Sequence, residues 1–122
     1  MKRKYVVVAG SNLSDSRHRI ERALAFIEAN WKVLRRSEIY STPDLLGSGM
    51  EYNNAVVEFE GVSEIGEVEL ALKNYERLEG RTPATRLSGK VPIDMDIVIY
   101  DEKVVRQKDF TTKYFKIGYS QL

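Results

Sequence analysis

Ile93-Asp94-Met95-Asp96-Ile97-Val98-Ile99-Tyr100 is the most clearly patterned stretch of the chain, and its alternation predicts a β-strand. Because alternate residues of a strand share a face, its apolar members are predicted to point into a core: Ile93, Met95, Ile97 and Ile99. Asp94 and Asp96 then point together to the opposite face, with Cα atoms about 6–7 Å apart. Neighbouring carboxylates repel each other unless a cation compensates them, and carboxylates on a rigid strand suit Mg²⁺. The pair is therefore a candidate metal site, with a solvated strand face as the alternative.

The segment before this strand carries the opposite charge. Arg81, Arg86 and Lys90 occur within ten residues, interleaved with Thr, Pro, Ser and Gly. Cations on a loop beside a metal site suit a triphosphate, because they neutralise charge that moves during phosphoryl transfer. Without the adjacent aspartates, an ordinary solvated loop is the better interpretation.

The rest of the chain alternates between strand and helix patterns. Residues 5–9, 31–40 and 54–60 predict strands. Apolar residues spaced by three and four predict two helices, with Ile20, Ala23, Leu24 and Ile27 in the first and Ile65, Val68, Leu72 and Tyr75 in the second. Asn12 or Ser14 and then Ser63 are the predicted helix N-caps, and Gly80 is the predicted C-cap.

The remaining segments are less regular. Residues 43–51 and 81–91 are predicted loops, Val104-Val105 is a short edge strand, and residues 110–122 show only a weak aromatic pattern. The order of elements is then β-α-β-β-α-β. This order predicts an α+β fold, a ferredoxin-like sandwich in which an antiparallel sheet carries helices on one face.

Composition narrows the classes of function. The 122 residues, 43% hydrophobic, fit one domain over residues 1–122. A net charge of +1 gives no support for electrostatic binding to nucleic acid or membrane. With no cysteine and His18 as the one histidine, cysteine zinc sites and multi-histidine metal sites are excluded. The apolar run 5–9 is too short for a signal peptide or membrane span, so we expect a soluble cytoplasmic protein.

Short words along the chain match one known family in order and spacing. They are Gly10-Ser11-Asn12-Leu13, Tyr40-Ser41-Thr42-Pro43, Tyr52-Asn53-Asn54-Ala55, Glu76 with Gly80-Arg81, and Ile93-Asp94-Met95-Asp96-Ile97. Together they resemble the 6-hydroxymethyl-7,8-dihydropterin pyrophosphokinase family. The resemblance implies a ferredoxin-like fold and transfer of the β,γ-pyrophosphate of ATP to the pterin hydroxymethyl group. AMP is released, and the product lies on the way to folate.

The resemblance also implies roles for individual residues. Two Mg²⁺ ions are expected on Asp94 and Asp96, which with Arg81 and Lys90 form the expected catalytic set. The pterin is expected to contact Thr42, Pro43, Leu45, Tyr52, Asn54 and Phe115, where Tyr52 and Phe115 stack on the ring and Asn54 bonds to it. ATP is expected to contact Glu76, Arg81, Arg86 and Lys90.

Departures from the family pattern keep alternatives open. Where the family carries a Trp-Gly-Pro-Arg-like word, this chain has Lys90 only near the arginine position, and lysine cannot make the same bidentate contact. The tail lacks the family's histidine and arginine, for which Lys113 or Lys116 is the candidate replacement. One alternative is therefore a pterin- or nucleotide-binding relative with impaired catalysis. Another is an RNA-binding module of the same shape, which the two aspartates disfavour because they repel phosphate.

Overall fold

The computed structural model describes residues 1–43 and 51–122. Six strands form one sheet: β1 (Arg3–Ser11), β2 (Lys32–Arg36), β3 (Tyr40–Pro43), β4 (Glu51–Gly61), β5 (Asp94–Tyr100) and β6 (Lys103–Val104). The helices in these ranges are α1 (Ser16–Asn30), α2 (Ile65–Leu78), α3 (Pro83–Ser88), α4 (Gln107–Phe110) and α5 (Lys113–Tyr119). None of these helices is long and apolar enough to cross a membrane.

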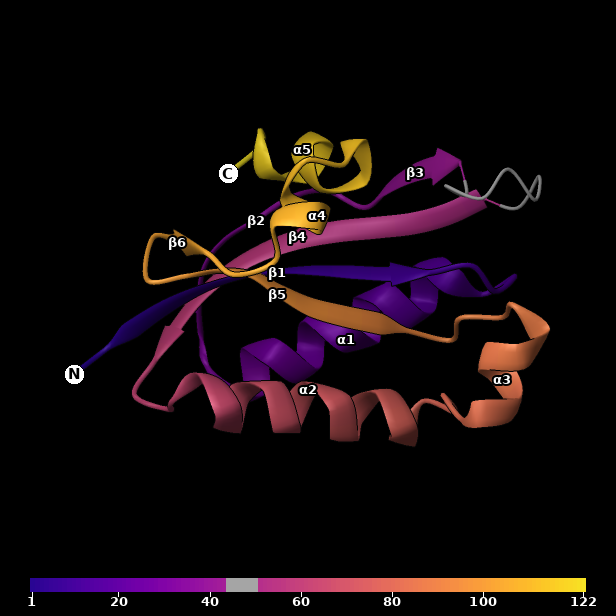
Figure 1. Cartoon of the computed structure of the whole chain (residues 1–122), viewed down its shortest axis with the longest axis horizontal. Coiled ribbons are helices and arrows are strands. Elements are labelled where there is room, and N and C mark those ends of the chain that lie inside the picture. Colours follow the sequence, from indigo (N-terminus) through magenta and orange to yellow (C-terminus); the bar gives the residue numbers. More distant parts are fainter. Residues whose placement is uncertain (44–50) are drawn as a thin grey trace.

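The sheet confirms the predicted ferredoxin-like plan. Its strand order is β2-β4-β1-β5-β6, with β3 also paired to β4, and every pairing is antiparallel. Figure 1 shows α1 and α2 side by side on one face of this sheet. They bury a core against it that includes Tyr5, Val7, Ile20, Leu24, Ile27, Val57, Phe59, Val68, Leu72 and Met95. Both predicted helix stripes therefore face the sheet.

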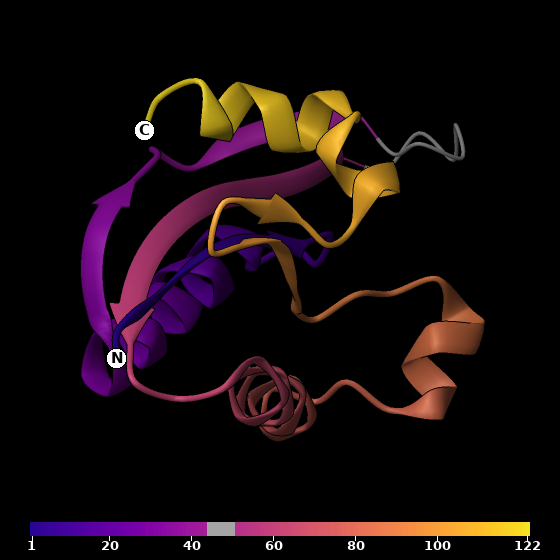
Figure 2. The same ribbon diagram turned by 60° about the vertical axis from the view of Figure 1, so that its left-hand side comes forward.

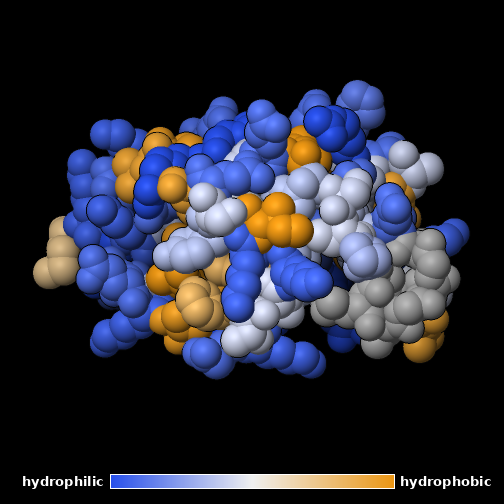
Figure 3. Space-filling model, turned by 90° about the horizontal axis from the view of Figure 1, so that it is seen from above, coloured by the Kyte–Doolittle hydropathy of each residue, from blue (hydrophilic) through white to orange (hydrophobic). Residues whose placement is uncertain are grey.

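The opposite face is covered in part by helices that the sequence analysis did not predict. Figures 1 and 2 show α4 and α5 on this side, while α3 stands apart at one end of the sheet. Phe115 of α5 is fully buried there in a second apolar cluster with Val6, Val8, Val56, Val98 and Ile99. Figure 3 looks down on this face and shows mostly hydrophilic side chains with a few hydrophobic ones among them.

One of the four side chains predicted to point into the core, that of Ile99, points to the other face of the sheet. Ile99 lies in the second cluster, not in the core beneath α1 and α2. The cause is an irregularity in the β1–β5 ladder, where Val6 pairs with Ile99 but Val7 pairs with Ile97. The extra residue, Val98, reverses the alternation beyond it.

Two predicted segments are built differently. The strand predicted over residues 31–40 is two strands, because Ser37 leaves the ladder and binds Val56 through both its N–H (2.8 Å) and its Oγ (2.9 Å). The loop predicted over residues 81–91 contains α3, which starts with a capping box between Thr82 and Thr85. Pro83 stands at the first helical position, where its missing N–H costs nothing.

The predicted ends of α1 and α2 agree with the structure only in part. Neither α1 nor α2 has a side-chain N-cap, so the predictions for Asn12, Ser14 and Ser63 are wrong. Asn12 instead accepts a hydrogen bond from Val91 N–H (2.7 Å) and donates one to the Gly89 carbonyl (2.9 Å). It thereby ties the end of β1 to the segment that leads into β5. Gly80 follows the α2 C-cap with a positive φ of 102°, as expected of a glycine that ends a helix.

Candidate active site

On the sheet face opposite α1 and α2, the part that α4 and α5 leave open carries a row of residues from neighbouring strands. Asn54 of β4 pairs with Gly10 of β1, and Gly10 pairs with Asp94 of β5. Directly opposed residues of an antiparallel sheet point to the same side, so the Asn54 amide and the Asp94 carboxylate share this face. Two strand spacings separate them by about 10 Å.

Gly10 leaves a recess between the amide and the carboxylate. A Cβ atom at this position would lie 3.3 Å from Asn54 Oδ1 and 3.8 Å from Tyr52 Cδ2. Any side chain here would therefore cover the floor between Asn54 and Asp94. The Gly-Ser-Asn word thus serves the site in two ways, since Gly10 keeps the floor open and Asn12 anchors the segment before β5.

The residues expected to hold a pterin gather around this recess from β3 and β4. Thr42 pairs with Tyr52, and Asn54 Nδ2 donates a hydrogen bond to Thr42 Oγ1 (2.8 Å). Thr42 and Asn54 are 7% and 3% exposed, so they form a floor, while Tyr52 is half-buried. Pro43 is exposed at the end of β3, and Leu45 falls outside the described residues.

Phe115 does not join this group. Its side chain is fully buried beneath α5, with ring centroids 5.8 Å from Phe110 and 5.1 Å from Tyr119. An aromatic ring enclosed in a core has no free face for a ligand, so the structure gives Phe115 a packing role.

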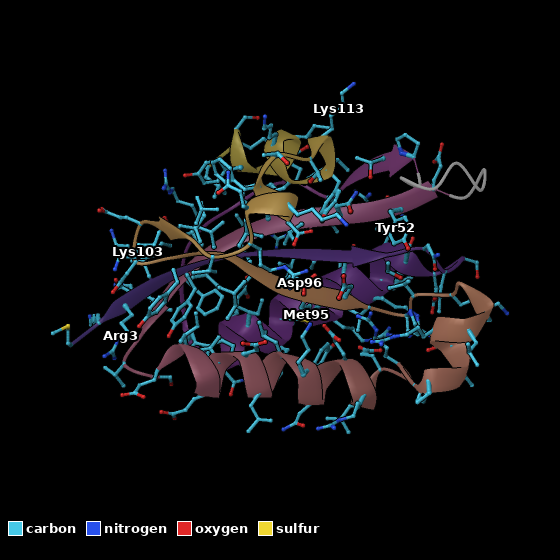
Figure 4. The ribbon with its side chains drawn as sticks, in the orientation of Figure 1. Arg3, Tyr52, Met95, Asp96, Lys103 and Lys113 are labelled. Atoms are coloured by element: carbon cyan, nitrogen blue, oxygen red, sulfur yellow. The ribbon has the colours of Figure 1, made fainter. Side chains whose placement is uncertain are left out.

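Asp94 and Asp96 share one side of β5, as the alternation predicts, and cations of the chain itself approach them. Arg81 Nη1 lies 2.5 Å from Asp94 Oδ1, and Lys73 Nζ lies 3.2 Å from Asp96 Oδ1. Arg106 Nη1 lies 3.8 Å from the same Asp96 oxygen. Figure 4 shows Asp96 on β5 and Tyr52 on β4. Part of the cation compensation expected between the aspartates is thus supplied by side chains.

Glu76 organises this charge cluster from α2. The residue is 4% exposed, and its Oε2 accepts hydrogen bonds from Met95 N–H (2.8 Å) and Lys73 Nζ (2.9 Å). Its Oε1 accepts one from Arg81 Nη1 (3.1 Å). Glu76 therefore fixes the edge of β5 and orients both cations that reach the aspartates.

Burial and mutual repulsion give the two aspartates different pKa values. Burial, then the charge of Asp94 and a hydrogen bond to it, raises the pKa of Asp96 to about 7. Burial also favours neutral Asp94, but hydrogen bonds from Asp96 and Arg81 outweigh it and hold the pKa of Asp94 below its usual range. Burial disfavours the charged form of Lys73, yet Asp96 and Glu76 raise its pKa above the ordinary lysine value. Lys73 is therefore cationic at neutral pH.

The donor set fits a hard divalent cation that arrives with oxygen ligands of its own. Within residues 1–43 and 51–122, no group of three or more His, Cys, Asp or Glu side chains is arranged to hold a metal ion. The protein offers two carboxylates on one strand, and Mg²⁺ is commonly bound through one or two carboxylates plus substrate phosphates. The chemistry of the pair therefore matches a metal–nucleotide complex better than a free metal.

One hollow opens beside Asp96 and a second lies between α2 and α3, and Lys73 borders both. One, of about 210 Å³, lies between α2 and β5, with an apolar lining that includes Leu72, Met95 and Ile97 and with Asp96 and Arg106 at its margin. The other, of about 470 Å³, lies between the end of α2 and α3, and its cations are Lys73, Arg77, Arg81 and Arg86.

The predicted loop cations divide into two groups. Arg81 contacts the carboxylates directly, whereas Arg86 and Lys90 are exposed on and after α3. In the described part of the chain, neither Arg86 nor Lys90 forms an ion pair with the aspartates. Lys73 and Arg106 do form such ion pairs, although their positions in the sequence did not predict it. For Lys73 a weak signal existed, because it precedes Glu76 by three residues on the same helical face.

The fold and this site define a ferredoxin-like sandwich whose open sheet face carries paired carboxylates beside a buried amide. The chain belongs to the 7,8-dihydro-6-hydroxymethylpterin-pyrophosphokinase (HPPK) family, whose model matches residues 6–118. It is also 31% identical over 116 residues to the mitochondrial folate synthesis bifunctional protein of Pisum sativum. That match covers 92% of this chain and 22% of the pea protein, so the chain spans about a fifth of that relative's length. The family resemblance seen in the short words is thereby confirmed.

Proposed function

We propose that this chain transfers the β,γ-pyrophosphate of ATP to the hydroxyl group of 6-hydroxymethyl-7,8-dihydropterin and releases AMP, with Mg²⁺ as cofactor. The observation that carries the proposal is the row Asn54–Gly10–Asp94, in which three strands bring a buried amide, an open floor and a carboxylate into one register. Family membership and the folate-synthesis relative support the same reaction.

The pterin end of the row is built for a flat ring with donors and acceptors along its edge. The Asn54 amide and the Thr42 hydroxyl supply complementary groups in a buried floor, and the half-buried Tyr52 ring supplies a stacking surface. A pterin seated on Gly10 would direct its hydroxymethyl group along the row toward Asp94. The reacting hydroxyl then lies on the side of the carboxylates.

The nucleotide fits along the α2 side of β5. Met95 turns both backbone groups to this edge, its N–H to Glu76 and its carbonyl to Lys73 (3.1 Å). Ile97 follows two residues further along and lines the smaller hollow, where a backbone donor and acceptor would suit the edge of a purine. The triphosphate would then run toward the cations around the aspartates, with Arg81 first and Arg86 and Lys90 on the adjacent segment.

Asp94 and Asp96 are the proposed ligands of Mg²⁺, which when bound would neutralise phosphate charge and polarise the phosphorus under attack. Glu76 holds Arg81 by a hydrogen bond, and the guanidinium held in this way would contact the same phosphates. One carboxylate of the pair is the proposed acceptor of the hydroxyl proton. Most of the rate enhancement then comes from positioning and from charge neutralisation.

The alternative is a relative that binds pterin or nucleotide and turns over poorly. The observation that favours it is the placement of Lys90, which is exposed and stands only near the position where the family pattern has an arginine. Calorimetry separates the two functions, because tight pterin binding without AMP formation supports the impaired relative.

The decisive experiment mixes the protein with ATP, Mg²⁺ and 6-hydroxymethyl-7,8-dihydropterin and measures AMP. We expect pterin-dependent AMP release that is lost in Asp94→Asn and in Asp96→Asn, while circular dichroism shows both variants folded. Asp101→Asn, in the exposed turn between β5 and β6, is the matched control and keeps wild-type activity. Folded wild-type protein that releases no AMP above background rules out the enzyme, and normal turnover by both site variants rules out the metal assignment.

A further inference from the structure

Lys73 occupies the centre of the acidic cluster, although the reaction as described does not use it. Its ammonium lies 2.9 Å from Glu76 Oε2, 3.1 Å from the Met95 carbonyl oxygen and 3.2 Å from Asp96 Oδ1. Asp94 Oδ1 is 3.9 Å away. An ammonium has three N–H donors, and these three nearest oxygens account for all of them. Lys73 therefore sits among oxygens much as a bound cation would.

Both aspartates already have cations of the chain beside them. Arg81 and Lys73 approach Asp94, and Lys73 and Arg106 approach Asp96, although Arg106 is shared with Asp109. A divalent ion that enters alone would meet aspartates already neutralised and an ammonium within a few ångströms of its own position. Like charges at such a distance weaken binding strongly when they are shielded from water. A metal–nucleotide complex carries net negative charge and meets no such penalty.

We propose that Lys73 is a built-in cation that excludes free metal from the aspartate pair and then binds a phosphate of the metal–nucleotide complex. The inference rests on the proposed function, since it assumes that this pair receives the metal. When the metal takes over Asp96, Lys73 keeps its anchors on Glu76 and Met95 and has one donor released for an anionic oxygen. Its position on the border of both hollows places that donor where a triphosphate would pass.

The test measures metal binding without turnover. The probe is Mn²⁺, and the electron paramagnetic resonance signal of the free ion reports how much of it is unbound. Titrations are made with and without α,β-methylene-ATP, an ATP analogue that resists cleavage at the scissile bond. Lys73→Gln removes the charge. Lys32→Gln removes an equal charge from β2 and is the control.

Opposite shifts are expected in the two conditions. Without nucleotide, Lys73→Gln binds Mn²⁺ roughly tenfold or more tightly than wild type, because a like charge has been removed. With the nucleotide analogue, the same variant binds the Mn²⁺–nucleotide complex more weakly, because a phosphate partner is lost. Lys32→Gln changes neither affinity. A residue that only supports the local structure would shift both affinities in the same direction.

Three results overturn the proposal: unchanged or weaker Mn²⁺ binding by nucleotide-free Lys73→Gln, tighter binding of the Mn²⁺–nucleotide complex by it, or wild-type protein that binds free Mn²⁺ much more tightly than about 1 mM. The last result needs no variant, so it decides the matter even if Lys73→Gln fails to fold. The AMP assay on wild-type protein does not depend on these titrations. An active enzyme with unaltered Mn²⁺ affinities removes the role of Lys73 alone, whereas an inactive protein with the expected shifts removes the reaction alone.

Discussion

Replacing Asp96 by asparagine should change the pH dependence of stability. Relative to wild type, the variant should gain stability as the pH rises. The substitution keeps the size of the side chain and removes its ionisation. In the folded protein burial, together with the neighbouring charge of Asp94, raises the pKa of Asp96 from the ordinary 3.8 to about 7. The side chain is 11% exposed, so water screens this effect only slightly.

The sign follows from proton counting. Between the ordinary pKa and the raised one, the folded state holds a proton on Asp96 that the unfolded state has lost, so the free energy of unfolding falls as pH rises. From pH 5 to pH 8 this amounts to roughly 1–3 kcal/mol for a carboxyl shifted this far. Asp94 stays ionised throughout this window because its pKa lies below the usual range, and it therefore adds no slope.

Urea unfolding of both proteins at pH 5 and at pH 8, in buffer with a chelator, measures the difference. We expect Asp96→Asn to gain that amount over wild type on going from pH 5 to pH 8. If the difference in stability between the two proteins is the same at both pH values, the pKa of Asp96 is not raised in the folded protein. The electrostatic description of the carboxylate pair would then be wrong.

Two further substitutions test the packing that supports the site. Gly118→Ala in α5 should cost about 1–3 kcal/mol of stability in urea unfolding, because its Cβ would lie 2.5 Å from Val56 Cγ2 and 2.6 Å from the Tyr40 hydroxyl. Gly66→Ala in α2 meets nothing within 4 Å and should be neutral or stabilising by up to about 1 kcal/mol, so equal effects of the two would contradict the placement of α5. Glu79→Gln should cost about 1–2 kcal/mol at pH 7, because Glu79 accepts hydrogen bonds from Arg22 (2.9 and 3.0 Å) and Tyr75 (2.5 Å). These bonds lower the pKa of Glu79, so its contribution is present above the ordinary carboxyl pKa and disappears as pH falls through the lowered one. A loss that does not shrink as the pH is lowered would refute the ion-pair explanation.

Local pattern was enough to predict β1, α1, β4, α2 and β5 in their order, whereas the direction of individual side chains also depended on long-range strand pairing. The alternation of β5 placed Asp94 and Asp96 together correctly, because both lie before the irregularity at Val98. Beyond that point the same alternation misplaced Ile99. A ladder irregularity depends on the partner strand, and residues 93–100 alone carry no sign of it.

The helices α3 and α5, which were not predicted, have weaker sequence signals than α1 and α2. Thr82-Pro83-Ala84-Thr85 is a capping sequence followed by too few apolar residues to suggest a helix, since α3 buries no residue at all. In α5 the buried residues Phe115 and Gly118 are three apart, the spacing of a helical face. The resemblance drew Phe115 toward the ligand because it is aromatic, whereas the structure uses that ring to fasten α5 to the sheet.

The tail also shows how the site obtains a cation from a different position. The family pattern has an arginine in this region, and Lys113 or Lys116 was the predicted substitute. Both lysines are exposed on α5, and Figure 4 shows Lys113 far from Asp96. The tail cation that reaches the carboxylates is Arg106, which precedes α4 and is held by an ion pair with Asp109. Because the Arg106 N–H donates to the carbonyl of Val98 (3.4 Å), the irregular end of β5 and the position of this guanidinium are linked. A change that straightened β5 would thus move both Ile99 and the charge beside Asp96.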